Sequence, residues 1–164
     1  MMKLNKVKIV FCDIDGTLLE MGKTEITPNM RKALCSLKQN GIKICIATGR
    51  PFVTIPMFEG IVFDAILAFN GSFCVAGDQV VAKCPIPKED VKKIIENAKR
   101  MERPVSIATA EEIVANGSDK DLEDYFAIAH HRVNVSEKFE EYVEKDVFQI
   151  MLGCDLEERK YILE

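Results

Sequence analysis

At 164 residues, of which 48% are hydrophobic, the chain is long enough to bury the core of one domain, or of one domain and part of another. Its 22 lysine and arginine residues are outnumbered by 26 aspartate and glutamate residues, and the formal net charge is -4. This composition excludes a disordered or fibrous protein, and without a basic stripe or cluster nucleic acid is not expected as a partner.

The cysteines and histidines predict no metal site. The six cysteines form no C-x-x-C pair and mostly lie inside apolar runs, where a thiol serves as a small hydrophobic group. The pair His130-His131 is assigned a solvated or packing role, because adjacent side chains diverge. The first residues lack the long apolar stretch of a signal peptide, and no segment approaches about twenty uninterrupted apolar residues. We therefore expect a cytoplasmic protein without a membrane partner.

An apolar segment that includes Val7 and Phe11 ends in the run Asp13-Ile14-Asp15-Gly16-Thr17. Side chains alternate along a strand, so the two carboxylates begin on the same side, and a turn at Gly16 can direct both toward one ligand. A divalent cation would offset the repulsion between them. The run predicts a phosphoryl-transfer site, and the alternative is an ordinary hairpin corner, since Asp, Gly and Thr are common turn residues.

The following residues are predicted to complete a βαβ unit. Residues 18–26 form a polar, glycine-containing segment that we expect to fold over the site as a flap. A helix then begins with Thr27 as its N-cap and Pro28 at its first position, and it ends at Asn40-Gly41. The apolar run 42–47 is predicted to be a strand parallel to the first.

Candidate ligand-binding residues gather at the carboxyl ends of these strands, where ligands bind in open sheets of this kind. Thr48-Gly49-Arg50 follows the second strand. A short helix over about residues 51–58 and a third strand over 65–69 then lead to Asn70-Gly71. The alternatives to phosphate contacts are a plain strand-to-helix turn at Thr48-Gly49, a surface ion pair at Arg50 and an ordinary tight turn at Asn70-Gly71.

Beyond Asn70 the pattern changes from βαβ to a hairpin followed by mixed elements. The hairpin is predicted to pair residues 72–76 with 79–84 around Gly77-Asp78. The later predicted elements are a helix over 87–101, a strand over 105–108, a helix over 121–128, a strand over 147–152 and a helix over 156–164. We predict the α/β fold class with two domains, residues 1–82 and 83–164.

The chemistry of phosphate monoester hydrolysis suits these residues, because it needs a nucleophile, charge neutralisation and a proton for the leaving oxygen. Asp13 is the candidate nucleophile that forms an aspartyl-phosphate, and Asp15 is the candidate acid and base. Mg2+ is the expected cofactor, held by the Asp13 side chain and the Asp15 backbone carbonyl. The Thr48 hydroxyl and the Gly49 amide are expected to bind phosphoryl oxygens, helped by the dipole of the helix predicted from Pro51.

The strand ends resemble a known family. The run Asp13-Ile14-Asp15-Gly16-Thr17-Leu18-Leu19 is similar to the first motif of the haloacid dehalogenase superfamily of phosphohydrolases, and Ile46-Ala47-Thr48-Gly49-Arg50-Pro51 is similar to the second. The helix start Ile26-Thr27-Pro28 and the run Phe69-Asn70-Gly71-Ser72 resemble its Cof-type subfamily. The resemblance implies a Rossmann-like parallel-sheet core over residues 1–82, here incomplete, with an inserted α/β cap domain, here partial.

The resemblance also implies an activity. It makes Asp13 the nucleophile, Asp15 the acid and base, and Thr48 a phosphate ligand in the Mg2+-dependent hydrolysis of sugar phosphates or other small phosphorylated metabolites. An aspartate at the second acidic position implies hydrolysis, since the ion pumps of that superfamily have lysine there. The full set of candidate phosphate-binding residues is Gly16, Thr17, Thr48, Gly49, Arg50 and Asn70.

One departure from the family pattern limits this interpretation. The family also uses a lysine and an acidic G-D-x-x-N-D-like motif beyond the cap, and the sequence contains no such acidic run. We therefore interpret the chain as the N-terminal portion of a Cof-like phosphatase with an incomplete site, and we expect weak or absent hydrolysis. The alternative is a binding or interaction module that keeps the acidic loop without turnover. Incomplete packing also predicts self-association as a homo-oligomer.

Overall fold

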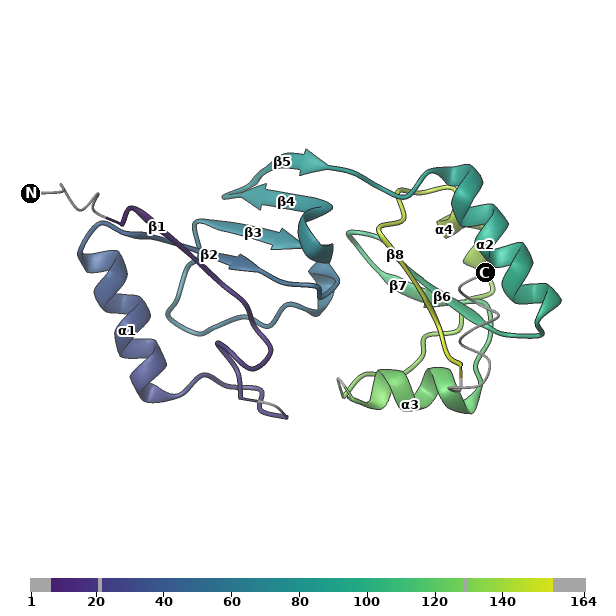
Figure 1. Cartoon of the computed structure of the whole chain (residues 1–164), viewed down its shortest axis with the longest axis horizontal. Coiled ribbons are helices and arrows are strands. Elements are labelled where there is room, and N and C mark those ends of the chain that lie inside the picture. The colour runs from purple at the N-terminus through teal and green to yellow at the C-terminus, as the bar shows by residue number, and fades with distance from the viewer. Residues whose placement is uncertain (1–6, 21, 129, 155–164) are drawn as a thin grey trace, which may run out of the picture. The chain divides into compact units, whose positions relative to one another are not determined.

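The computed structural model describes residues 7–20, 22–128 and 130–154 (Figure 1). Contacts between residues divide the chain into two compact units, Met1–Lys83 and Cys84–Glu164. Each unit combines one sheet with helices, so the predicted α/β class is confirmed. No helix within the described ranges has the length and apolar character needed to cross a lipid bilayer.

The first unit is built on a five-stranded sheet of order β1-β2-β3-β4-β5. The β1–β2 and β2–β3 pairs are parallel, as predicted, and the other two pairs are antiparallel. The predicted hairpin forms from β4 and β5, and it extends this sheet beyond β3. The strands are β1 (Ile9–Cys12), β2 (Lys43–Ala47), β3 (Ala65–Ala68), β4 (Phe73–Ala76) and β5 (Gln79–Lys83).

The crossover helix α1 (Pro28–Gln39) begins and ends where its capping residues predict. The Thr27 hydroxyl accepts a hydrogen bond from the Met30 amide at 3.2 Å, which satisfies one of the free donors of the first turn. Gly41 has a φ of 72°, the left-handed conformation that commonly ends helices. Leu34 of α1 packs with Ile44 of β2 in the core of the first unit.

The segment predicted to be a polar flap is partly core. Leu18, Leu19 and Ile26 are all buried, and they join the apolar cluster that holds α1 against the sheet. The prediction of a free flap is wrong at these positions, because apolar side chains after the acidic run anchor the segment to the core. Its intervening residues 22–25 are exposed.

The short helix expected from Pro51 to Phe58 is not present. A single 3-10 turn covers Phe52–Thr54, and Ile55 then adopts an extended conformation with φ -73° and ψ 120°. Ile55 precedes Pro56, whose ring disfavours the helical conformation in the residue before it. No α-helix dipole therefore acts on the site from this segment.

The second unit contains a three-stranded antiparallel sheet of order β7-β6-β8. Apolar side chains of α2 and α4, such as Val91 and Phe139, pack with Val105 and Ile107 of β6 in its core. The elements are α2 (Lys88–Arg100), β6 (Val105–Ala108), β7 (Ile113–Ala115), α3 (Lys120–Ile128), α4 (Phe139–Val143) and β8 (Gln149–Leu152).

Most of these elements confirm the sequence-based predictions, and the differences lie in short segments. The strand expected over 147–152 begins at Gln149, and β7 and α4, of three and five residues, were not predicted. Segments this short carry too few residues to show a period. The helix predicted over 156–164 lies outside the described residues.

The N-cap of α1 gives a direct test of this local structure. Thr27→Ala removes the acceptor of the Met30 amide, so we expect the free energy of unfolding to fall by about 1 kcal/mol. Thr27→Ser keeps the hydroxyl and serves as the matched control. Urea unfolding followed by circular dichroism measures both variants, and an alanine variant as stable as the parent would contradict the assigned cap.

Candidate functional site

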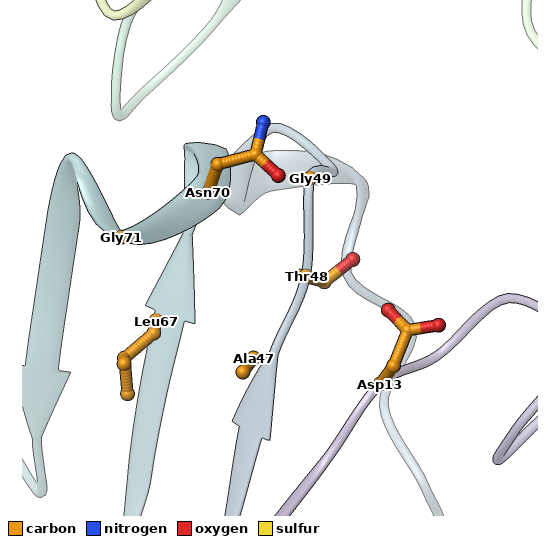
Figure 2. Close-up of a pocket in the computed structure, with 7 residues that line it drawn as sticks. All are labelled: Asp13, Ala47, Thr48, Gly49, Leu67, Asn70 and Gly71. Atoms are coloured by element: carbon orange, nitrogen blue, oxygen red, sulfur yellow. The ribbon is translucent and has the colours of Figure 1, made fainter.

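A pocket lies at the carboxyl ends of the three parallel strands (Figure 2). Asp13 directly follows β1, Thr48 directly follows β2, and Asn70 lies two residues beyond β3. The structure therefore brings these residues together at one edge of the sheet, as the βαβ pattern predicted. The pocket is lined by Asp13, Ala47, Thr48, Gly49, Leu67, Asn70 and Gly71.

The acidic run forms a tight turn with alternating side chains. Ile14 is fully buried in the core, whereas Asp13 and Asp15 on either side of it are exposed. Gly16 has a φ of 80°, and its amide donates to the Leu19 carbonyl at 2.8 Å. The turn thus requires the conformational freedom of glycine at this position. Burial of Ile14 fixes the run and leaves the Asp13 carboxylate facing the pocket (Figure 2).

Thr48 is held rigidly at the end of β2. Its side chain is buried, its amide donates to the Leu67 carbonyl at 2.9 Å, and its hydroxyl accepts a hydrogen bond from the Arg50 amide at 3.2 Å. Accepting from Arg50 leaves the hydroxyl hydrogen of Thr48 to be donated elsewhere. Figure 2 shows this hydroxyl and the Asp13 carboxylate on the same side of the pocket.

Gly49 and Asn70 are in close contact. A Cβ atom added at Gly49 would lie 3.1 Å from Oδ1 of Asn70, so glycine is what allows the amide side chain to lie over this backbone (Figure 2). A side chain at position 49 would push the Asn70 amide aside. The pair brings one backbone amide and one side-chain amide to the rim of the pocket.

The loop that carries Asn70 is strained. Phe69, Asn70 and Gly71 have φ values of 50°, 56° and 94°, and non-glycine residues in this region each cost about 1–3 kcal/mol. Two backbone hydrogen bonds hold the loop, from the Phe69 amide to the Arg50 carbonyl at 3.1 Å and from the Asn70 amide to the Thr48 carbonyl at 3.0 Å. Strain of this kind clusters at functional sites, although asparagine also adopts this conformation in ordinary turns.

Arg50 forms an ion pair with Asp15. Its Nε and Nη2 atoms donate to Oδ2 and Oδ1 of Asp15 at 2.8 and 2.6 Å. This hydrogen bonding lowers the pKa of Asp15 below its ordinary value and raises the pKa of Arg50. The ion-pair alternative for Arg50 is therefore what the structure shows, and its partner is the candidate acid and base.

Not every predicted residue lies in the pocket. Among the residues that the structure describes, Asp15, Gly16, Thr17 and Arg50 are not part of its lining. Gly71, which was named as part of the Asn70-Gly71 turn, does line it, and so do Ala47 and Leu67, which were not among the candidate site residues. The position of Ala47 and Leu67 near strand ends was the available signal, but alanine and leucine carry no chemistry that singles them out.

The donors at this edge fit a magnesium ion only in part. The described part of the chain has no group of three or more His, Cys, Asp or Glu side chains placed to hold a metal. The Asp13 side chain and the Asp15 carbonyl are the two candidate oxygen ligands, and so small a set is compatible with Mg2+, which usually keeps several waters and binds through one or two carboxylates with substrate phosphates. His130 and His131 are exposed, which agrees with the predicted solvated role.

Comparison with known proteins supports the geometry. Residues 10–164 match the model of a family described as haloacid dehalogenase-like hydrolase. The chain is 30% identical over 156 residues to "Putative phosphatase YkrA" of Bacillus subtilis (strain 168), an alignment that covers 93% of this chain and 60% of YkrA. The family match and this relative agree with the resemblance to Cof-type proteins that the sequence motifs indicated. The chain thus spans about three fifths of the length of that relative.

Solved structures show the same architecture. The phosphatase BT1666 from Bacteroides thetaiotaomicron superposes with a TM-score of 0.82 at 28% identity, covering 96% of this chain and 59% of BT1666. The subclass IIB sugar phosphatase BT4131 superposes with a TM-score of 0.75, also at 28% identity, covering 96% of this chain and 62% of that protein.

The Asp15–Arg50 pair predicts a pH dependence of stability. Because the pKa of Asp15 is lowered from 3.8 in the folded state, its stabilisation is present above that value and is lost as the pH falls through the lower folded value. The side chain of Asp15 is 49% exposed, so we expect less than about 1 kcal/mol.

The measurement is urea unfolding of the parent chain and Asp15→Asn between pH 6 and pH 3, without added divalent cations. The difference in unfolding free energy is expected to shrink below about pH 4. A difference that stays constant over this range would contradict the pairing. Asp78→Asn, at an exposed hairpin turn in the same unit, is the matched control.

Proposed function

Because the chain belongs to the haloacid dehalogenase-like hydrolase family, we propose that it carries the nucleophile and phosphate-binding part of a phosphatase for small phosphorylated metabolites. The observation that supports this function best is the meeting of Asp13, Thr48 and Gly49 in one pocket. A carboxylate that can act as the nucleophile, with a hydroxyl and a backbone amide that can donate to phosphoryl oxygens, suits phosphoryl transfer to an aspartate.

In the proposed first step, a carboxylate oxygen of Asp13 attacks phosphorus while the bond from phosphorus to the leaving oxygen breaks. The leaving oxygen takes a proton from Asp15. Water then attacks the aspartyl-phosphate, Asp15 accepts its proton, and inorganic phosphate leaves as the Asp13 carboxylate is restored. The Arg50 pair lowers the pKa of Asp15, which favours the ionised form that accepts the proton in the second step and disfavours the protonated form that the first step needs.

The phosphoryl oxygens are assigned to donors at the strand ends. The Thr48 hydroxyl and the Gly49 amide are the proposed inner contacts, and the Asn70 side chain beside Gly49 is a further one. Gly16 and Thr17 are proposed to contribute from the exposed turn after Asp15. When bound, Mg2+ would neutralise charge on the phosphoryl group, with the Asp13 side chain and the Asp15 carbonyl as its protein ligands.

Residues 83–164 are proposed to form part of a cap domain, and residues 1–82 part of the catalytic core. The division of contacts between Lys83 and Cys84 supports this assignment. The cap is proposed to select the substrate. The relatives suggest a sugar phosphate or a similar metabolite, since BT4131 is described as a sugar phosphatase and YitU of Bacillus subtilis as a 5-amino-6-(5-phospho-D-ribitylamino)uracil phosphatase.

Two further properties belong to this proposal. We propose a cytoplasmic location, which is supported by six free thiols, including the exposed Cys84. We also propose a homo-oligomer. Val7, Ile9 and Phe11, in and before β1, are exposed, and within the described residues β1 pairs with a strand on one side only.

A binding module without turnover is the second candidate function. It is favoured by the finding that the described residues contain no group of three or more His, Cys, Asp or Glu side chains that could hold a metal ion. Such a module would bind inorganic phosphate in the pocket without hydrolysing esters.

Hydrolysis of p-nitrophenyl phosphate distinguishes the two functions. We expect slow hydrolysis that requires Mg2+ and stops on chelation, and we expect Asp13→Asn to reduce it by about a thousandfold or more, because the nucleophile is lost. Asp78→Asn is the matched control and is expected to keep the parent rate. Activity that persists in Asp13→Asn would contradict the assignment of the nucleophile. Phosphate binding without hydrolysis by the parent chain would favour the module.

Light scattering tests the proposed self-association. We expect a mass above that of a monomer of 18.5 kDa, because apolar side chains and a strand edge are exposed. Phe11→Ser, which replaces an exposed apolar side chain on β1, is expected to shift the mass toward the monomer. A monomeric parent chain over a wide concentration range would contradict the proposal.

A further inference from the structure

We propose that Arg50 is a positioning residue that orients Asp15 for proton transfer, and that it is not a phosphate ligand. This inference rests on the proposed phosphatase function and deepens it. Arg50 lies just beyond the end of β2, and its proposed role is in proton transfer by Asp15.

The guanidinium group fixes both oxygens of the Asp15 carboxylate. The two bonds of 2.8 and 2.6 Å are parallel and bidentate, a geometry that restrains the carboxylate in position and in rotation. The third bond, from Nη1 to the Thr54 carbonyl at 3.3 Å, anchors the guanidinium itself. We call these three hydrogen bonds of the Arg50 guanidinium the Arg50 clamp. The side chain of Asp15 is 49% exposed, so without the clamp it has room to change rotamer.

The backbone of Arg50 forms hydrogen bonds with the segments that carry the proposed phosphate-binding residues. Its amide donates to the Thr48 hydroxyl at 3.2 Å, and its carbonyl accepts from the Phe69 amide at 3.1 Å. One residue thus contacts the acid and base through its side chain and the phosphate-binding loops through its main chain. The position of Asp15 is thereby fixed relative to Thr48, where the phosphoryl group is proposed to bind.

The same contacts argue against a phosphate-binding role for Arg50. The charge of its guanidinium is already compensated by Asp15, whose two carboxylate oxygens both accept hydrogen bonds from it. The Arg50–Asp15 pair is also less exposed than an ordinary surface ion pair. Arg100 and Glu96 form such a pair, with side chains 69% and 64% exposed, whereas the side chain of Arg50 is 25% exposed. Exposed pairs contribute little, and the Arg50 clamp is more enclosed and multiply bonded.

The test compares kcat, KM and phosphate binding in matched variants. The parent chain, Arg50→Gln, Arg50→Lys, Asp15→Asn and the double variant Arg50→Gln/Asp15→Asn are assayed with p-nitrophenyl phosphate and Mg2+. Calorimetry measures the binding of inorganic phosphate to each, and circular dichroism checks that each folds. Arg100→Gln, which removes the exposed arginine of the other pair, is the matched control.

A positioning role predicts that Arg50→Gln lowers kcat by about tenfold or more, within what an acid or base contributes, while KM and phosphate affinity change by less than about threefold. Arg50→Lys, which keeps the charge but not the bidentate fork, is expected to recover part of kcat. The double variant is expected to match Asp15→Asn, because Arg50 acts through Asp15. Should Arg50→Gln fail to fold, Arg50→Lys carries the same comparison.

Three results would overturn the inference. A higher KM and weaker phosphate binding in Arg50→Gln, with kcat kept, would make Arg50 a phosphate ligand. A further loss of kcat in the double variant relative to Asp15→Asn would show a role independent of Asp15. A parent chain that hydrolyses nothing would remove the proposed function and the inference with it, and that failure is separate because it appears before any substitution.

Discussion

Parallel pairing of the first three strands is the constraint on which the rest of the site depends. Cys12 of β1 lies opposite Ile46 of β2, and Ala47 of β2 lies opposite Leu67 of β3. Because parallel strands end at the same edge, the next residues along each strand become neighbours. Strand pairing thereby brings together the Asp13 carboxylate, the Thr48 hydroxyl and the Asn70 side-chain amide, which are far apart in the sequence.

The loops at this edge are set by hydrogen bonds and by burial. Arg50 is at the centre of this network, since its side chain holds Asp15, its amide binds the Thr48 hydroxyl and its carbonyl accepts from Phe69. The positive φ values at Phe69 and Asn70 cost free energy that these bonds help to offset. The buried side chain of Ile14 anchors the acidic turn to the core. Both main-chain hydrogen bonds and side-chain contacts therefore hold the loops of the site in place.

The features predicted correctly from the sequence are those that depend on short-range patterns of residues. Apolar runs located β1, β2 and β3, the Thr27 cap located α1, and the acidic and threonine-glycine motifs located the pocket. The helix expected after Pro51 did not form, because Pro56 disfavours the helical conformation in the residue before it. The flap prediction failed because Leu18 and Leu19 reach a core formed by distant residues. The Asp15–Arg50 pair links positions 35 residues apart, and the sequence did not identify the partner of Arg50.

The central claim is that Asp13 becomes phosphorylated, and trapping the covalent intermediate tests it most directly. The chain is incubated with Mg2+ and a radiolabelled acyl phosphate, quenched in acid and digested, and the labelled peptide is sequenced by mass spectrometry. The account predicts label on Asp13, in a form that hydroxylamine releases as expected for an acyl phosphate. Label on another residue, or continued hydrolysis with no labelled peptide, would contradict it.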